Sequence, residues 1–165
     1  MDKNQLAIQY MEQGKMEEAA KIFGEMIEEN PKDPIGFINF GNVLASMNDT
    51  ERAIKFFERA IELDPQAATA YYGLGGIYYD QDDLLKAKDC YEQAIKKGLE
   101  SSDTMFMLGL CLLHLDQPRL ALPYFQRSTE LNGADAEAMF HYGLALASAE
   151  MYDMAIEAWE HTLEL

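Results

Sequence analysis

The sequence predicts an all-α fold made of five tandem helix-turn-helix units. Three observations predict it: a period of 34 residues, helical spacing of apolar side chains within each period, and a polar turn at the same place in each period. A fixed period of about 20 to 50 residues is typical of repeat arrays, in which neighbouring units bury each other's apolar faces. The expected units are residues 1–33, 34–67, 68–101, 102–135 and 136–165.

The period shows as columns of similar residues 34 positions apart. The alanine column contains Ala19, Ala53, Ala87, Ala121 and Ala155. The aromatic column contains Phe23, Phe57, Tyr91, Phe125 and Trp159. The small-residue column contains Ala7, Gly41, Gly75, Gly109 and Gly143. We expect the small residues to let the two helices of a unit approach closely, and the aromatic rings to fill the gap toward the next unit.

Each unit contains two helical stretches separated by a polar turn. In the second unit, the i, i+3, i+4, i+7 spacing of one helix face is followed by Phe37, Phe40, Gly41 and Leu44. A second helical stretch is marked by Ala53, Phe57, Ala60 and Ile61. Turn residues such as Asn48 and Asp49 are expected to cap free helix N–H groups, and Pro118 suits a first helical turn. Pro123 lies inside a predicted helix, where we expect a bend or a loss of about 3 kcal/mol.

Charge restricts the class of partner. The chain has 165 residues, with 13 Lys and Arg against 29 Asp and Glu, so its formal net charge is −16. Nucleic acids and anionic membranes would repel such a surface, so we expect neutral or basic partners. The longest apolar run, residues 105–113, is too short to span a bilayer, and the N-terminal residues do not form a signal peptide. Two isolated cysteines fit a reducing compartment, so a cytoplasmic location is expected.

The columns of unit two resemble the tetratricopeptide repeat (TPR) family, and the resemblance covers the whole chain. The family's pattern of large, Leu, Gly, aromatic, Ala, aromatic, Ala and Pro is matched by Phe37, Phe40, Gly41, Leu44, Ala53, Phe57, Ala60 and Pro65. The chain is similar to small stand-alone bacterial members of the family. The resemblance implies a right-handed α-solenoid whose first helices line a concave groove. It also implies a non-enzymatic adaptor that holds a peptide or a partner's helix in that groove.

If the first helices face inward, the groove is polar in unit two and aromatic from unit three onward. The candidate binding residues are Asn39, Asn42, Ser46, Tyr72, Gly73, Gly76, Tyr79, Asp80, Asp103, Phe106, Met107, Leu110, Phe140, His141 and Leu144. The polar members suit the main chain of an extended peptide, or are simply solvated. Gly73 and Gly76 predict either a notch in the groove or a space that a bulky neighbour fills. The apolar members are typical of interface anchors, with packing against adjacent helices as the alternative.

The placement of charge predicts the character of the ligand. Lys3 is the single basic residue in a first helix, whereas first helices and their rims carry several carboxylates. We therefore expect a negative groove and a neutral-to-basic protein or peptide segment with an apolar anchor. TPR co-chaperones that bind a C-terminal carboxylate use basic groove residues. Thr69, Gly73 and Asp103 stand in their place here, which counts against that use.

Nothing in the sequence predicts catalysis. His114, His141 and His161 fall in different columns, and no cluster has metal-ligand spacing. Phosphate-binding loops and nucleophile elbows are also missing. We expect no enzyme activity, no cofactor and no metal.

The last helix suggests a second class of function. Trp159, Thr162 and Leu163 occupy columns that cover the next unit elsewhere in the chain, so we expect them to be exposed. This end then forms a homodimer or binds a partner, and the protein acts as an oligomerising scaffold. Alternatively, the chain is a fragment that lacks a capping helix.

Overall fold

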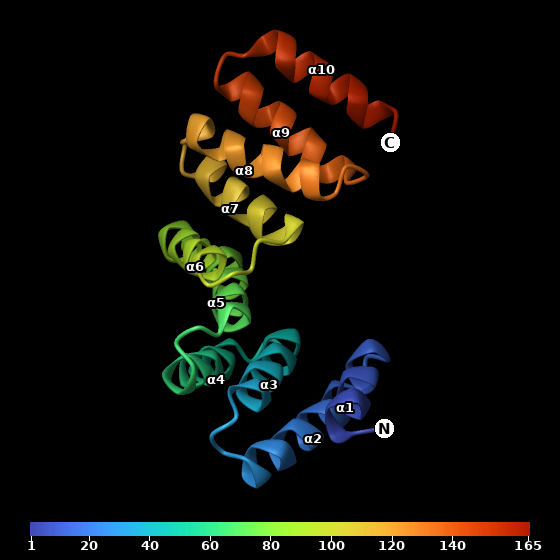
Figure 1. The fold of residues 1–165 in the computed structure, drawn as a ribbon, viewed down its shortest axis with the longest axis vertical. Coiled ribbons are helices and arrows are strands. Elements are labelled where there is room, and N and C mark those ends of the chain that lie inside the picture. The colour runs from blue at the N-terminus through green and yellow to red at the C-terminus, as the bar shows by residue number, and fades with distance from the viewer. The chain divides into compact units, whose positions relative to one another are not determined.

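The computed structural model describes all 165 residues, and every regular element in it is an α-helix (Figure 1). The helices are α1 (Lys3–Glu12), α2 (Met16–Glu29), α3 (Pro34–Ser46), α4 (Thr50–Leu63), α5 (Ala68–Asp80), α6 (Leu84–Lys96), α7 (Ser102–His114), α8 (Pro118–Leu131), α9 (Ala136–Ser148) and α10 (Tyr152–Leu163). Consecutive helices pair into five helix-turn-helix units, which confirms the predicted all-α fold. None of the ten combines the length and apolarity needed to cross a bilayer.

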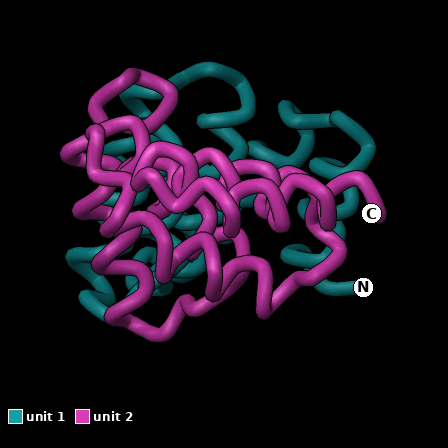
Figure 2. Tube along the Cα trace, turned by 90° about the horizontal axis from the view of Figure 1, so that it is seen from above, with its two compact units in different colours: residues 1–77 teal, residues 78–165 magenta.

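The chain divides into two compact units, residues 1–77 and 78–165, which Figure 2 colours separately. Within the first unit α1 packs on α2, α2 on α3, and α3 on α4. Within the second unit α6 to α10 pack in chain order, each on the next, and α7 also touches α9. Each compact unit is therefore a stack of helices in which helices adjacent in the sequence also pack on each other.

The turn inside each helix pair has the same backbone conformation. One residue per turn takes a left-handed conformation with φ between 59° and 76°: Gly14, Asn48, Asp82, Asp116 and Glu150. The next residue donates its N–H to a carbonyl five residues back, as Asp49 does to Leu44 at 2.9 Å. This is the Schellman arrangement that closes a helix C-terminus. The turn residues therefore close the C-terminus of the preceding helix. Only some turns also cap the N-terminus of the following helix, as the Asp83 side chain does by accepting from the N–H of Lys86.

The core follows the predicted columns. Phe23, Phe57 and Phe125 are completely buried, and Tyr91 is 1% exposed. Glycines of the small-residue column give room to two of these rings: a Cβ added at Gly41 would lie 2.9 Å from the ring of Phe57, and one at Gly109 would lie 2.8 Å from that of Phe125. The expectation that these glycines let two helix backbones approach is thus corrected. They accommodate the aromatic side chain of their own unit's second helix.

Pro123 does not interrupt its helix. α8 runs continuously from Pro118 to Leu131, with Pro118 at its first turn as predicted and Pro123 inside. Pro123 is exposed, so its ring points away from the core. The carbonyl of Arg119 still lacks the N–H that a residue other than proline would supply at position 123.

Candidate functional site

Four rings on α7, α8 and α9 form an aromatic cluster in the second compact unit: Phe106, Phe125, Phe140 and His141. The imidazole of His141 lies 5.3 Å from the ring of Phe106 and 5.5 Å from that of Phe140, edge to face in both cases. It stacks on the ring of Phe125 at 6.4 Å. Phe125 is buried, Phe106 and His141 are half-buried, and Phe140 is 45% exposed. The aromatic cluster thus rises from the core to a solvent-exposed ring.

A hydrogen bond fixes the orientation of His141. Its Nδ1 lies 2.8 Å from the carbonyl oxygen of Glu137. Because a carbonyl only accepts, Nδ1 carries the proton. In the neutral ring Nε2 is then an acceptor, which a ligand N–H or O–H can use.

The two first helices that carry the aromatic cluster have no basic residue to offset their carboxylates. Neither α7 nor α9 contains Lys or Arg. Asp103 and Glu137 are exposed in the first turns of these helices, and Met107 and Leu144 are half-buried. The surface around the cluster therefore combines apolar contact area with negative charge.

Tyr79 belongs to a neighbouring polar cavity. Its ring lies 6.2 Å from that of His114. Together with Asp82 and Leu84 these side chains line a cavity of about 430 Å³. Burial, followed by the nearby Cys111 and Asp80, raises the pKa of the Tyr79 hydroxyl above its ordinary value. Tyr79 is therefore a neutral hydrogen-bond donor at physiological pH.

Some polar candidates in the first compact unit, residues 1–77, already form hydrogen bonds within the protein. The side-chain amide of Asn39 donates to the Oδ1 of Asn4 at 2.8 Å. The Ser46 hydroxyl donates to the carbonyl of Asn42 in its own helix at 3.0 Å. Asn42 is exposed and Tyr72 is half-buried. Of the polar set, Asn42 offers its whole amide to a ligand.

At two candidate groove residues the structure agrees with the alternative that the sequence left open. Gly73 does not form a notch, because the ring of Phe57 fills the space beside it; an added Cβ would lie 2.4 Å from that ring. Leu110 is buried, with 7% of its surface exposed, because α7 is packed against α6, α8 and α9. Leu110 therefore offers almost no contact surface to a ligand, whereas Gly73 itself stays half-buried. Gly76 stays half-buried, and Asp80 is exposed.

The three candidates on α10 differ in exposure. Trp159 is half-buried, and its Nε1 donates to the carbonyl of Phe140 at 3.2 Å. Thr162 donates its hydroxyl to the carbonyl of Ala158 at 2.9 Å. Leu163 is 88% exposed. The predicted exposure thus holds for Leu163, whereas Trp159 and Thr162 are half-buried, Trp159 because its ring packs against Gly143.

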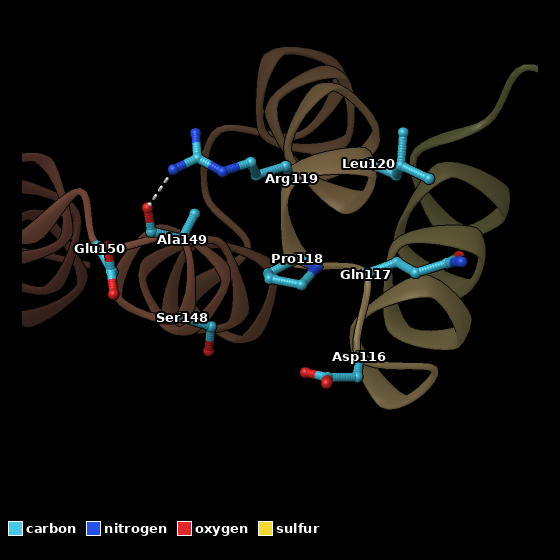
Figure 3. Close-up of a pocket in the computed structure, with 8 residues that line it drawn as sticks. All are labelled: Asp116, Gln117, Pro118, Arg119, Leu120, Ser148, Ala149 and Glu150. Atoms are coloured by element: carbon cyan, nitrogen blue, oxygen red, sulfur yellow. Dashed lines mark hydrogen bonds between the residues drawn. The ribbon is translucent and has the colours of Figure 1, made fainter.

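One cavity escaped the sequence analysis. It has a volume of about 450 Å³ and lies between the turn after α7 and the turn after α9 (Figure 3). Arg119 reaches across it and donates from Nη2 to the carbonyl of Ala149 at 3.0 Å. The lining residues are Asp116, Gln117, Pro118, Arg119, Leu120, Ser148, Ala149 and Glu150. The two turns occupy equivalent positions in the 34-residue period. That equivalence was the sequence signal that could have pointed to this cavity.

The structure does not assemble the metal or thiol chemistry that the sequence analysis considered. No group of three or more His, Cys, Asp or Glu side chains comes together as a metal site requires. Burial raises the pKa of the Cys111 thiol to about 12 and that of Cys90 to about 11. Both thiols are therefore protonated at neutral pH and poor nucleophiles.

The arrangement of helices is similar to the crystal structure of YrrB, described as a TPR protein with an unusual peptide-binding site. The two share 47% sequence identity with a TM-score of 0.86, over 88% of this chain and 75% of the YrrB chain. The chain belongs to the tetratricopeptide repeat family. The resemblance seen in the sequence is thereby confirmed.

Family models match nearly the whole TPR chain. A TPR repeat model matches residues 41–82, and tetratricopeptide repeat models match residues 66–134 and 115–161. A PPR repeat model matches residues 4–31, which contain the first helix pair. Three of the four matches are thus to tetratricopeptide repeat models, and together these span residues 41–161.

Likeness to more distant structures supports the fold of this TPR protein and nothing beyond the fold. MamA has 21% identity and a TM-score of 0.84 over 99% of this chain and 94% of its own. PilF of Pseudomonas aeruginosa has 22% identity and a TM-score of 0.88 over 98% of this chain and 74% of its own. The curated TPR repeat-containing protein YrrB of Bacillus subtilis (strain 168) is 49% identical over 41 residues, which span 20% of that protein. Family and fold together identify a protein-interaction module.

Proposed function

We propose that this TPR protein is a non-enzymatic adaptor that binds a neutral-to-basic peptide segment of a partner protein. The aromatic cluster carries the proposal, because Phe140 exposes 45% of its surface above a buried aromatic base. An exposed aromatic side chain held by its neighbours is a typical interface anchor, since little side-chain freedom is lost on binding. An apolar or aromatic side chain of the ligand would pack against Phe106 and Phe140.

Charge favours the basic character of the ligand. Asp103 and Glu137 lie one helical turn before Phe106 and Phe140, with no Lys or Arg on either helix. Carboxylates so placed attract cationic segments and repel acidic ones, mainly through the association rate. The relative YrrB, with its peptide-binding site, supports a peptide as the ligand class. The two free cysteines favour a cytoplasmic setting.

The test is selection of peptides on immobilised protein, followed by affinity measurements on variants. A peptide library displayed on phage is selected against the whole chain, and the selected sequences are synthesised with a fluorophore. We expect peptides with a net positive charge and at least one apolar or aromatic residue. Their affinity should fall at least tenfold with Phe140→Ala, and it should fall as salt is raised.

Leu85→Ala is the matched control, because Leu85 is also an exposed apolar side chain, 62% exposed, on α6. It should leave affinity unchanged. Binding that survives Phe140→Ala and Phe106→Ala in folded protein, or a preference for acidic peptides, would refute the proposal.

A further inference from the structure

Two cavities lie along the turns of the third, fourth and fifth helix-turn-helix units. One is the polar cavity beside Tyr79, and the other is the cavity of Figure 3. Their volumes are about 430 and 450 Å³, within the range of about 300 to 1,000 Å³ that is typical of ligand pockets. Each is formed between two consecutive units, so neither belongs to an end of the helix stack. We call them the turn cavities.

The turn cavities occupy equivalent positions in the 34-residue period. Three pairs of lining residues are 34 positions apart: Asp82 and Asp116, Leu84 and Pro118, and His114 and Ser148. Both aspartates have the left-handed turn conformation, with φ of 61° and 60°. Each cavity therefore has a turn carboxylate on one side and the last residue of the next unit's first helix on the other.

The two turn carboxylates have no cationic partner in the chain. No ion pair and no side-chain hydrogen bond engages Asp82 or Asp116. Asp83, the next residue of the same turn, does pair with Lys86, at 3.8 Å. Asp82 and Asp116 are also exposed to solvent. Both carboxylates can therefore receive a cation from another molecule.

Arg119 does not neutralise the carboxylates of the second cavity. Its Nη2 donates to the carbonyl of Ala149 at 3.0 Å, and it forms no ion pair with Asp116 or Glu150. In the view of Figure 3, its guanidinium and the Asp116 carboxylate lie on opposite sides of Pro118. Two carboxylates and one guanidinium leave this cavity with a net negative charge. The first cavity is lined by no Lys or Arg.

The polar groups of each turn cavity match a basic side chain. A lysine ammonium donates three hydrogen bonds, an arginine guanidinium donates five, and neither accepts any. In the first cavity the acceptors are the Asp82 carboxylate, the Tyr79 hydroxyl oxygen and a ring nitrogen of His114. In the second they include the Asp116 carboxylate and the Ser148 hydroxyl oxygen. None of these side chains hydrogen-bonds to another group of the chain, so all are free to bind a ligand.

We propose that the turn cavities bind two basic side chains, lysine or arginine, of one extended segment of a partner protein. The aliphatic stem of each side chain lies on Leu84 in the first cavity and on Pro118 in the second, and its charged end meets Asp82 or Asp116. One segment occupies both cavities, because like cavities recur at successive turns and the first contact raises the effective concentration for the second. The turn cavities are separate from the aromatic cluster, so this site does not rest on the proposed peptide site.

A series of two-lysine peptides tests the proposal. Each labelled peptide has two lysines separated by one to ten glycine and serine residues, with both ends blocked. One reference peptide has a single lysine, and another has norleucine, which is uncharged, in place of both lysines. Anisotropy gives the affinity, and amide chemical shifts of the whole protein locate the bound peptide. We expect one optimum spacing that binds at least tenfold more tightly than a single lysine, with shift changes around Asp82 and Asp116.

Variants test which carboxylates are used. Asp82→Asn and Asp116→Asn should each weaken the best peptide at least tenfold, to the affinity of the single-lysine peptide. Asparagine suits this turn, because Asn48 holds the equivalent position with φ of 59°, so the melting temperature should be unchanged. Asp89→Asn is the matched control, because it removes an exposed carboxylate of α6 outside both cavities, and it should change affinity less than twofold. Phe140→Ala should leave this binding intact, which separates it from binding at the aromatic cluster.

Three results would each overturn the proposal. The affinity does not depend on the spacing of the lysines, the norleucine peptide binds as tightly as the lysine peptide, or Asp89→Asn weakens binding as much as Asp82→Asn. Spermidine, a free polyamine, is the competitor that tests the source of the cation. If it displaced the best peptide at equal concentration, the turn cavities would be assigned to a small polycation and not to a protein segment.

Discussion

The ring of Phe57 occupies the space into which a side chain at Gly73 would project. An added Cβ would lie 2.4 Å from Cζ of Phe57, closer than real Cβ contacts allow. Phe57 is fully buried and its ring also lies close to Gly41. A shift of the ring would therefore disturb the core, and we infer that packing between the second and third helix-turn-helix units requires glycine at position 73.

Gly73→Ala should therefore destabilise the protein by about 1 to 3 kcal/mol, the usual result of overpacking a rigid core. Urea unfolding followed by circular dichroism measures the change. Adding Phe57→Leu to Gly73→Ala should recover part of the loss, because the smaller side chain removes the clash. An alanine at position 73 that costs nothing would mean that the ring of Phe57 can yield.

Gly24→Ala should have the opposite sign. Gly24 lies inside α2, and a Cβ added there meets no atom within 4 Å. Alanine is favoured over glycine in a helix interior by about 1 kcal/mol. The same urea experiment should show a gain of this size, and a loss would indicate a contact that the structure does not contain.

Glu150→Gly should stabilise the turn between α9 and α10. Glu150 has φ of 64°, a left-handed conformation that costs a residue with a Cβ roughly 1 to 2 kcal/mol. Gly14, at the equivalent turn, has φ of 76° and no such cost. We expect a gain of about 1 kcal/mol for Glu150→Gly and a loss of similar size for Gly14→Ala. A Glu150→Gly variant no more stable than the unchanged protein would contradict the argument that Glu150 is strained.

Pro123→Lys should also stabilise the protein, by about 1 to 3 kcal/mol, because it returns a helix N–H to the carbonyl of Arg119. Lysine is chosen because Lys21 and Lys55 occupy the equivalent column in α2 and α4. Thermal unfolding measures the gain. An unchanged melting temperature would show that the missing hydrogen bond is fully replaced by water.

Stability should decline in alkali. Burial raises the pKa of Cys111 from 9.0 to about 12, so the unfolded chain loses this proton at a lower pH than the folded chain. The stabilising effect is complete below about pH 9 and is lost progressively as pH rises toward 12. The free energy of unfolding at pH 8, 9.5 and 10.5 should therefore fall, and Cys111→Ala should fall less steeply. Parallel slopes for the two proteins would exclude Cys111 as a cause.

The fold was predictable because its causes are periodic. The alanine and aromatic columns, the turns and the helix pairs all repeat every 34 residues, so each unit reinforces the interpretation of the others. The sequence left two possibilities open at Gly73, a notch or a filled space, because this glycine departs from the period. Its partner Phe57 is 16 residues away, and nothing in the pattern tells which ring turns toward it.

The candidate site was predictable in composition and less so in exposure. Phe140 lies at the surface as expected, whereas Leu110 on α7 is buried although its equivalent on α9, Leu144, is half-buried. The sequences of α7 and α9 are compatible with burial or exposure of these side chains, because exposure depends on which neighbouring helices pack on α7 and α9. The hydrogen bond between Asn39 and Asn4 likewise joins two helix-turn-helix units, residues 1–33 and 34–67. The sequence of neither helix alone predicts it.

The position of Trp159 decides what spectroscopy can measure on this protein. Its indole is bound to α9 within residues 78–165, while circular dichroism averages all ten helices. Fluorescence therefore records unfolding around α9 and α10, and circular dichroism records the loss of all ten helices. Coincident transitions by the two methods would show that the helices around Trp159 unfold together with the remainder of the chain.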